Sequence, residues 1–349
     1  MERIEPGITP LILKLVAEID EFKGRWRALK TLSPETLQQL RRIATIESIG
    51  SSTRIEGSHL SDLEVAKLLS GLGSQSFQDR DEQEVAGYAK AMEMVFDGWD
   101  NILLTENHIR QLHQVLLQFS IKDERHRGHY KTNPNNVAAF DADGKQIGII
   151  FETATPFQTP FEMTKLLNWF SETQKEERLH PLLIAGIFVV WFLAIHPFQD
   201  GNGRLSRVLT TLLLLRFGYS YVPYASLERI IEDNKPGYYS ALRETQQSMK
   251  ADVPHWESWL VFFLRCLSRQ KHGLEKRIES EQTVLSDLSG LSLDIIHLLG
   301  ERLNVTVASV VESTGANRNT VKAALQGLVR RGLIAQKGKG RAAHYTLLT

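Results

Sequence analysis

The stretch HPFQDGNGRLSR, residues 196–207, separates two of the most apolar segments of the chain. Residues 181–195 before it are nearly all apolar, and residues 208–217 after it are largely apolar again. We expect two buried helices, with the polar stretch held at the junction between them. A second helix that begins near Asn202 would point its free N–H groups, and the positive end of its dipole, into the turn.

This junction contains residue types that bind phosphate. Gly201 and Gly203 allow a tight turn and a close approach of the backbone to an anion. Arg204 and Arg207 are fixed cations suited to phosphate oxygens. The pattern therefore predicts an anion site at the start of the second helix.

A metal ligand and a base accompany these cations. Asp200 is a hard oxygen ligand suited to magnesium, and His196 titrates near neutral pH. A lone histidine at the end of an apolar helix is more often a hydrogen-bonded core residue. The combination instead indicates a site for a magnesium-bound polyphosphate with a proton acceptor beside it.

At every defining position the stretch resembles the signature of the Fic family, His-x-Phe-x-Asp/Glu-Gly-Asn-Gly-Arg-x-x-Arg. The resemblance implies transfer of AMP from ATP to a Ser, Thr or Tyr hydroxyl of a target protein, with Mg²⁺ required and self-modification left open. It also implies that His196 is the general base and that Asp200 holds the metal. Phe198 would anchor the loop in the core, and the implied nucleotide-binding set is Phe198, Gly201, Asn202, Gly203, Arg204 and Arg207.

Residues 48–57 interrupt an apolar helical pattern with small polar residues, which by itself predicts a loop before a helix that starts at Ser61. Beside the Fic resemblance, Ser52-x-x-x-Glu56-Gly57 is similar to that family's inhibitory motif, Ser/Thr-x-x-x-Glu-Gly/Asn. The resemblance implies that Glu56 pairs with Arg207 in the place of the γ-phosphate. We expect a bidentate, partly desolvated pair that holds the site inactive.

Two further segments carry the resemblance. Residues 127–131, RGHYK, resemble the family's Gly-x-Tyr-Arg with Lys131 in place of arginine, and the β-prone runs 136–140 and 146–151 around Asp143-Gly144 predict a hairpin. The resemblance implies that this hairpin is a flap that aligns the acceptor chain by strand addition. Tyr238, in a Tyr-Tyr-x-Ala-Leu run, would lie beside the adenine, with a core or interface tyrosine as the alternative.

The C-terminal part has its own pattern. Helical segments are predicted at 292–302, 307–313 and 318–331. Residues 332–334 then lead into a strand, 337–341 form a loop and 344–347 a closing strand, an order that resembles a winged helix. No Asp or Glu occurs after residue 313, and seven cations do: Arg318, Lys322, Arg330, Arg331, Lys337, Lys339 and Arg341. Residues 317–345 are therefore predicted either to bind DNA or to be a protein docking module.

These patterns predict a mainly α protein: a helical Fic fold with a β-hairpin flap, and a C-terminal winged helix-turn-helix domain. We expect an N-terminal helical region carrying the inhibitory motif at 1–100, a catalytic core at 101–275, and a linker with the winged helix at 276–349. The charged stretch 270–281 fits either a helix or a linker.

Composition restricts the class of protein. The 349 residues are 42% hydrophobic and 23% charged, with 41 acidic and 41 basic side chains, so the chain as a whole gives no reason to expect a nucleic-acid or membrane partner. A single cysteine, Cys266, can form no internal disulfide and fits the cytoplasm. No export signal is expected, and residues 181–195 are too few to span a membrane.

Alternatives to AMP transfer remain open from the sequence. A glutamate such as Glu56 could orient water for the reverse reaction, removal of AMP, and the signature selects phosphates better than it selects the base, so UMP transfer also fits. A different class is a DNA-binding regulator that senses a nucleotide, although such a sensor has no need of the base His196. A homodimer is neither indicated nor excluded.

Overall fold

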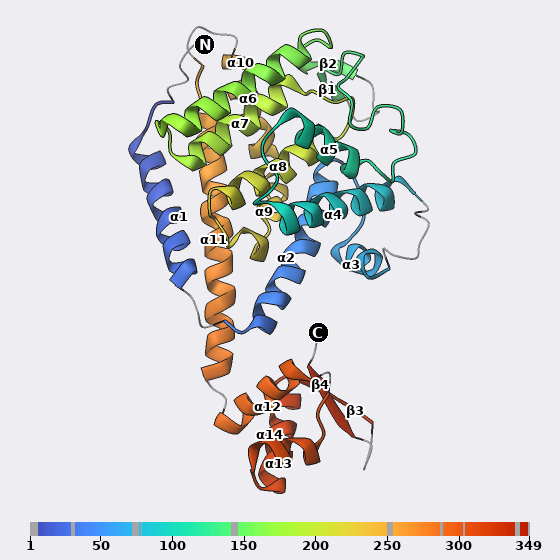
Figure 1. Ribbon diagram of the computed structural model, residues 1–349, viewed down its shortest axis with the longest axis vertical. Coiled ribbons are helices and arrows are strands. Elements are labelled where there is room, and N and C mark those ends of the chain that lie inside the picture. Colours follow the sequence, from blue (N-terminus) through green and yellow to red (C-terminus); the bar gives the residue numbers. More distant parts are fainter. Residues whose placement is uncertain are drawn as a thin grey trace. The chain divides into compact units, whose positions relative to one another are not determined.

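The structure, a computed structural model, describes residues 6–28, 32–71, 77, 79–140, 146–249, 254–286, 289–302, 304–338 and 343–347. Across these residues helices predominate, and strands occur as two antiparallel pairs (Figure 1). The prediction of a mainly α fold is confirmed. None of the helices in these ranges combines the length and the apolar content that a bilayer crossing requires.

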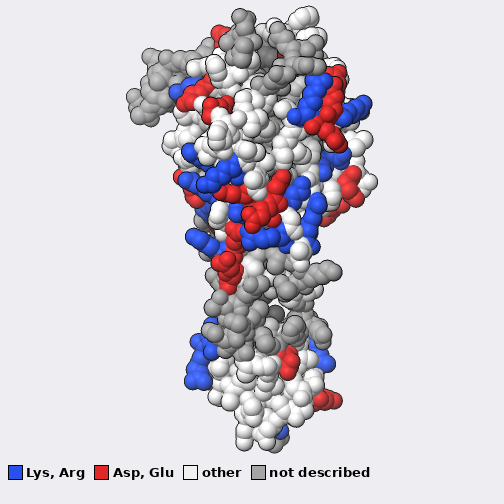
Figure 2. Space-filling view, turned by 90° about the vertical axis from the view of Figure 1, so that its left-hand side faces the viewer, with Lys and Arg blue, Asp and Glu red and all other residues white. Residues whose placement is uncertain are grey.

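The chain divides into two compact units, residues 1–32 with 40–272 and residues 33–39 with 273–349. The larger unit contains the glycine-rich junction, and the smaller unit contains the basic C-terminal segment. Figure 2 shows positive and negative side chains interspersed over the described surface of the larger unit on the face in view, in keeping with the balanced composition.

Two buried helices, α7 (Pro181–Ile195) and α8 (Asn202–Arg216), form the centre of the larger unit (Figure 1). Each fully buried Leu, Ile, Val or Phe contributes about 1.5–3 kcal/mol relative to exposure, so these apolar helices are the main source of its stability. Helices α4 (Arg80–Gly98), α5 (Glu106–Leu116), α6 (Thr159–Glu176) and α10 (Lys235–Ser248) pack around them. The polar junction between α7 and α8 is consequently held among buried helices.

The remaining helices before residue 287 are α1 (Pro10–Ala28), α2 (Pro34–Ile55), α3 (Asp62–Ser70), η1 (Val222–Tyr224), α9 (Leu227–Glu232) and α11 (Glu257–Ser286). Helices α2 and α11 each have residues in both units. The predicted start of a helix at Ser61 is confirmed, and Ser61 caps α3 in a capping box with Glu64. The charged residues 270–281 are helical within α11. Cys266 is buried, and burial raises the pKa of its thiol to about 12, which makes it unreactive.

The prediction of a loop at residues 48–57 is wrong, because α2 continues through Ile55. Ser51, Ser52 and Thr53 are fully buried in this last part of the helix. The Thr53 hydroxyl donates to the carbonyls of Ile49 and Gly50, both at 3.0 Å. Small side chains that return their hydroxyls to the preceding turn let a polar segment stay helical in a crowded interior.

The predicted hairpin is present in its two strands. Strand β1 (Val137–Phe140) pairs antiparallel with β2 (Gln146–Phe151), from Val137 opposite Phe151 to Phe140 opposite Gln146, with two shifts of register. The predicted turn at Asp143-Gly144 lies outside the described residues.

The smaller unit contains α12 (Gly290–Glu301), α13 (Val307–Thr314), α14 (Arg318–Arg330), β3 (Ile334–Lys337) and β4 (His344–Leu347). Strands β3 and β4 pair antiparallel, and Val305 forms a bridge with Tyr345 on the other side of β4. Gly315, at a φ of 66°, ends α13 in the left-handed region, where glycine costs least. The order of elements is the predicted one, and the winged-helix assignment stays a prediction; Lys339 and Arg341 lie outside the described residues.

Candidate functional site

The junction between α7 and α8 is a loop closed by its own side chains. Asn202 accepts from the backbone N–H of Phe198 at 2.9 Å and donates to the carbonyl of Phe198 at 2.7 Å, so the loop returns on itself. Gly201 has a φ of +79°, and a Cβ there would lie 3.5 Å from His113 Nε2. The amide of Asn202 is 1% exposed and is used inside the loop, where it shapes the backbone that faces a ligand.

His196 ends α7 in the left-handed region, with φ 52° and ψ 59°. Its Nδ1 lies 3.3 Å from the carbonyl of Leu193. Because a carbonyl only accepts, Nδ1 carries the proton and Nε2 keeps its lone pair. Burial and the nearby charge of Lys131 lower the pKa of His196 to about 4, although Glu56 and Asp200 oppose this shift. The imidazole is therefore neutral at pH 7 and able to accept a proton.

Phe198 anchors the loop, as the sequence predicted, and it does so against a histidine that the sequence did not single out. The ring of Phe198 is fully buried and stacks on His113 with centroids 3.8 Å apart. Gly128 N–H donates to His113 Nδ1 at 2.9 Å, so Nε2–H donates to the carbonyl of Asp200 at 3.0 Å. The only signal in the sequence was the position of His113 on the apolar face of α5, beside Ile109 and Leu112.

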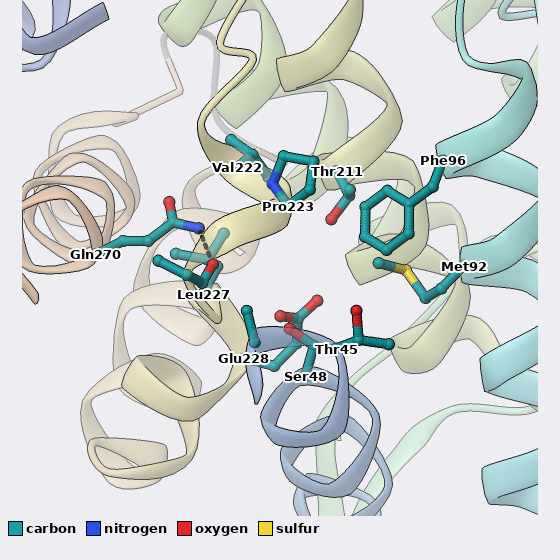
Figure 3. A pocket seen from close by; sticks show the side chains of 12 residues that line it. Thr45, Ser48, Met92, Phe96, Thr211, Val222, Pro223, Leu227, Glu228 and Gln270 are labelled. Carbon is teal, nitrogen blue, oxygen red and sulfur yellow. Dashed lines mark hydrogen bonds between the residues drawn. The ribbon is translucent and has the colours of Figure 1, made fainter. Parts of the chain in front are cut away.

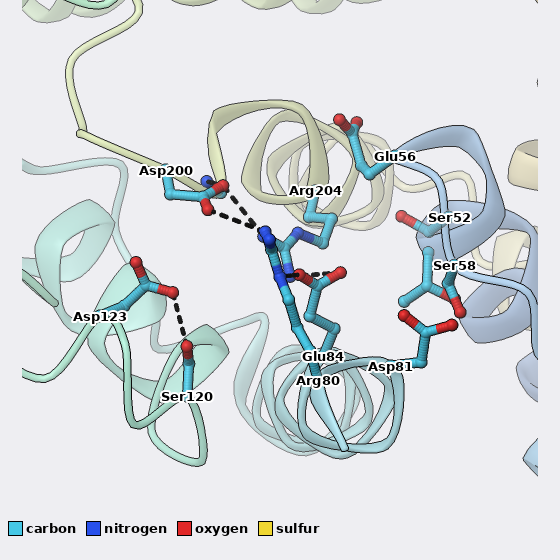
Figure 4. Close-up of polar contacts among 12 residues, drawn as sticks. Ser52, Glu56, Ser58, Arg80, Asp81, Glu84, Ser120, Asp123, Asp200 and Arg204 are labelled. Carbon is cyan, nitrogen blue, oxygen red and sulfur yellow. Dashed lines mark hydrogen bonds and ion pairs between the residues drawn. The ribbon is translucent and has the colours of Figure 1, made fainter. Parts of the chain in front are cut away.

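Two arginines and two carboxylates meet at the start of α8, as Figure 4 shows. Asp200 is 3.2 Å from Arg204 and 3.3 Å from Arg80, and Arg204 is 3.2 Å from Glu84 on α4. Burial raises the pKa of Asp200, but Arg204, the Gly201 N–H and Arg80 outweigh it and hold that pKa below its usual value. Arg204 is 2% exposed, so its cation is fixed in place; sequence reasoning had identified neither Arg80 nor Glu84.

Asp200 also meets the requirements for a magnesium ligand. No group of three or more His, Cys, Asp or Glu side chains capable of holding a metal occurs among the residues that the structure describes. Mg²⁺ is usually held by one or two carboxylates together with substrate phosphates, so a single aspartate at a phosphate site fits an ion that arrives with a nucleotide. The Asp200 side chain is 30% exposed and therefore accessible.

Glu56 and Arg207 are brought together, as the sequence predicted. Glu56 Oε1 lies 2.7 Å from Arg207 Nη2. The pair is not bidentate, because Arg207 Nε donates to the Ser52 hydroxyl at 2.8 Å and Nη2 also donates to the Ser52 carbonyl at 2.9 Å. Burial raises the pKa of Glu56, but Arg207 outweighs it, and the net shift is downward. The pair is thus ionised at neutral pH.

The Glu56 carboxylate also covers the N-terminus of α8. A Cβ added to Gly203 would lie 2.1 Å from Glu56 Oε1, so the carboxylate rests directly on the first turn of that helix. This is where free N–H groups attract an anion. Gly57, which follows, has a φ of +108° and lets the chain turn away at this point.

The end of α2 is fixed by a network of ion pairs around Arg54. Arg54 pairs with Glu232 at 2.6 Å and with Asp62 at 2.9 Å, and its Nη1 donates to the Leu60 carbonyl at 2.9 Å. Arg229 pairs with Asp62 and, at 3.6 Å, with Glu232. Because Arg54 lies two residues before Glu56, this Arg54 network fixes the helix end next to the Glu56 carboxylate.

A buried polar path runs behind Arg207. Ser52 contacts Arg207, and the Tyr88 hydroxyl donates to Glu228 at 3.0 Å. Figure 3 shows the Glu228 carboxylate and the Thr45 hydroxyl facing a small pocket between α2, α4, α8 and α9. Gln270, on α11, closes one side by donating to the Ala225 carbonyl at 2.6 Å.

Tyr238 is 3% exposed and lies on α10 next to Arg207 and Ser206, and its ring is 5.8 Å from that of Trp259. Burial raises the pKa of its hydroxyl, with Arg207 opposing the shift. The neighbouring Tyr239 is 39% exposed. The contact of Tyr238 with an adenine stays a prediction.

Residues 103–214 match the model of the Fic/DOC family. A probable protein adenylyltransferase of Aquifex aeolicus is 31% identical over 100 residues, 29% of this chain and 28% of that protein. The protein adenylyltransferase Fic of Drosophila mojavensis is 25% identical over 206 residues, 58% of this chain and 38% of that protein. The chain thus spans less than half the length of these curated relatives.

Solved structures share the fold. A Fic family protein from Desulfovibrio desulfuricans has a TM-score of 0.66 and 24% identity, with 99% of this chain and 98% of that chain covered. A Fic domain containing signalling protein from Bacteroides thetaiotaomicron has a TM-score of 0.60 and 25% identity, with 75% and 97% covered.

Proposed function

Because residues 103–214 belong to the Fic/DOC family, we propose that this protein is an adenylyltransferase that moves AMP from ATP to a Ser, Thr or Tyr hydroxyl of a protein. One observation carries the proposal: a neutral His196, with its Nε2 free to accept a proton, ends one helix directly before the N-terminus of the next. The same helix N-terminus holds Arg204 and Arg207. A base beside a phosphate site is what transfer to a hydroxyl requires.

In the proposed reaction, His196 Nε2 takes the proton of the acceptor hydroxyl while its oxygen attacks the α-phosphorus of ATP. The bond from that phosphorus to the bridging oxygen breaks, and pyrophosphate leaves. The N–H groups at the start of α8 and the fixed cation of Arg204 stabilise the added negative charge. When bound at Asp200, Mg²⁺ would neutralise phosphate charge.

We further propose that Glu56 restrains this reaction. Its carboxylate engages Arg207 and rests on Gly203, so a polyphosphate and Glu56 compete for the same helix N-terminus. Two anions at one site repel each other, and ATP that binds beside Glu56 would be held out of line.

The test of the proposed function is incubation of the protein with ATP and Mg²⁺, followed by intact mass measurement. We expect one or more added AMP groups on Glu56→Gly, few on the wild type and none on His196→Ala. If Glu56→Gly adds no AMP to itself or to any protein in a cell extract, AMP transfer is not the activity of this protein.

The Arg54 network should set the strength of the restraint. Arg54→Ala, or Glu232→Gln in a milder form, is expected to raise AMP transfer about three- to tenfold, because a loosened α2 end places Glu56 less firmly; about 1.4 kcal/mol corresponds to tenfold. Transfer is measured with labelled ATP. In a Glu56→Gly background neither change should add a further increase.

Arg41→Ala is the matched control for Arg54→Ala. Arg41 lies on the same helix but pairs with Asp97 at 3.8 Å on the surface, and this pair contributes little. We expect wild-type transfer from this variant. A rate for Arg54→Ala equal to that of Arg41→Ala would show that the network does not position Glu56.

A second candidate function, DNA binding by the smaller unit, has one specific observation in its favour. On α14 the side chains of Val321, Leu325 and Leu328 are buried, while Arg318, Lys322, Gln326 and Arg330, at intervals of four, are exposed. A helix that presents cations and amides on one face after a helix-turn is suited to the major groove.

We therefore expect the full chain to bind duplex DNA with an affinity that falls at least about tenfold between about 50 and 200 mM salt. Electrophoretic mobility shift at several salt concentrations measures this. Arg318→Ala with Lys322→Ala should weaken binding, and Arg41→Ala should not. If no binding occurs at the lowest salt, the exposed face of α14 is better explained as a protein docking surface.

A further inference from the structure

Lys131 is a buried cation whose described partners are all neutral. It is 3% exposed, and its ammonium donates to Asn135 Oδ1 at 2.7 Å, to Thr153 Oγ1 at 2.9 Å and to the carbonyl of Ile195 at 3.0 Å. The one ammonium nitrogen thus meets three acceptors, two of which, Asn135 Oδ1 and Thr153 Oγ1, are themselves 3.0 Å apart. An ammonium can do this, whereas a planar guanidinium cannot place three donors around one point.

The three acceptors belong to three different segments. Ile195 is the last residue of α7 and directly precedes His196. Asn135 lies shortly before β1, and Thr153 lies shortly after β2, so the two ends of the hairpin meet at the Lys131 ammonium. The Lys131 side chain therefore connects the residue directly before His196, the general base of the proposed reaction, with both ends of the hairpin.

Further bonds run in parallel and make this connection rigid. The backbone N–H of Lys131 donates to the Pro197 carbonyl at 2.9 Å. The amide of Asn135 donates to the Phe198 carbonyl at 2.6 Å and to the His196 carbonyl at 3.2 Å. Removing the ammonium would take this donor from the buried carbonyl of Ile195, whereas Asn135 Oδ1 would still accept from the Thr153 hydroxyl at 3.0 Å.

The charge of Lys131 also acts on His196. Burial lowers the pKa of Lys131 to about 8, so the ammonium keeps its proton at neutral pH. Burial is the largest cause of the lowered pKa of His196. The positive charge of Lys131 lowers that pKa further, whereas the negative charges of Glu56 and Asp200 raise it.

We propose that Lys131 is a positioning residue for the proposed transfer: it holds both ends of the hairpin at a constant distance from His196 and places a buried positive charge at the Ile195 carbonyl, directly before His196. The inference rests on the proposed function in its chemistry, since it assigns the hairpin and His196 to one reaction. Its electrostatic part concerns His196 alone and can be measured without any transfer.

The experiment compares Lys131→Met and Lys131→Arg in the Glu56→Gly protein, so that the inhibitory carboxylate is absent from every sample. Lys131→Met is expected to reduce self-modification at least about tenfold and to move the acid limb of its pH profile upward by about half a unit or more. Lys131→Arg keeps the charge, so it should retain the parent's acid limb while its transfer rate falls. Lys14→Met, at an exposed lysine of α1, should match the parent in both respects.

A second readout does not need activity. NMR titration of the histidine ring protons, with His196→Ala used to assign the resonance, gives the protonation midpoint of His196. That midpoint should rise in Lys131→Met and stay low in Lys131→Arg. If Lys131→Met does not fold, the arginine variant still decides, since a rise of the midpoint there contradicts the electrostatic role.

The experiment distinguishes failure of the proposed function from failure of the inference about Lys131. A parent without transfer, in which Lys131→Met still raises the His196 midpoint, refutes the proposed function and leaves the charge effect supported. An unchanged midpoint in Lys131→Met, with or without a loss of transfer, overturns the inference and makes Lys131 a purely structural residue. ATP affinity from calorimetry should be equal in all variants, and a weakened affinity would also speak against a positioning role.

Discussion

Replacement of His196 by alanine in the Glu56→Gly protein is expected to reduce AMP transfer by about 10²- to 10⁴-fold, the range that a positioned general base supplies. A Ser, Thr or Tyr hydroxyl is a poor nucleophile, and His196 Nε2 is the free lone pair beside the phosphate site. Labelled ATP measures the transfer rate. Because Arg204, Arg207 and the start of α8 are untouched, the affinity for ATP, measured by calorimetry, should remain within about twofold.

His255→Ala is the control for this loss, since His255 is exposed and lies away from the junction. It should transfer AMP at the parent rate. Retention by His196→Ala of more than a few per cent of the activity would mean that another group takes the proton, and the assigned role would be wrong.

Glu56→Gly is expected to raise AMP transfer, including self-modification, by at least about tenfold, which corresponds to about 1.4 kcal/mol of released restraint. The change removes the carboxylate that engages Arg207 at 2.7 Å and rests against Gly203. The hydrogen bond from Arg207 to the Ser52 hydroxyl does not involve Glu56, so the Arg207 cation should stay where a γ-phosphate can reach it. Glu56→Gln, with the shape but not the charge, should give a smaller increase.

Glu177→Gly is the matched control for this change. Glu177 is an exposed glutamate just past the end of α6, as Glu56 is just past the end of α2, and its φ of 50° suits glycine. Its transfer rate should equal that of the wild type. Equal transfer by the wild type and Glu56→Gly would refute the restraint, whatever the absolute rate.

Lowering the pH is not expected to increase AMP transfer by removing the restraint of Glu56. The lowered pKa of Glu56 means that its pair with Arg207 persists at neutral pH and is lost only as the pH falls through that lowered value, below 4.5. The pKa of His196 is about 4, so the proposed base also takes up a proton as the pH falls. Transfer by the wild type should therefore not rise between pH 7 and pH 4.

The sequence was informative where one short segment contains the whole chemical arrangement. The glycines, the base, the aspartate and the two arginines of residues 196–207 lie within one loop and the first two turns of one helix, so their proximity follows from spacing alone. The apolar runs on both sides predicted α7 and α8 for the same reason. The partnership of Glu56 and Arg207 rested on resemblance, and the contact at 2.7 Å agrees with it.

Prediction failed or was silent where a residue's surroundings come from other segments. Residues 48–55 appeared too polar for a buried helix, yet the Thr53 hydroxyl bonds to the preceding turn and the Ser52 hydroxyl accepts from Arg207. His113 looked like an ordinary helical histidine, and its support of the Asp200 carbonyl depends on α5 lying against the loop. No pattern in the sequence pointed to Arg80, Glu84 or the Arg54 network, because their partners lie far along the chain or on another helix. Asp200 is 120 residues from Arg80, and Glu232 is 178 residues from Arg54.

By itself, the sequence determined the chemistry available at the junction: a base, an anion site and a carboxylate for a metal, all within reach because they are neighbours in the chain. The tertiary structure decided how that chemistry is held. It placed Glu56 on the first turn of α8, made Arg207 share its donors between Glu56 and Ser52, and set Lys131 between His196 and the hairpin. Burial and distance set these charges and hydrogen bonds, and neither quantity exists until the helices pack.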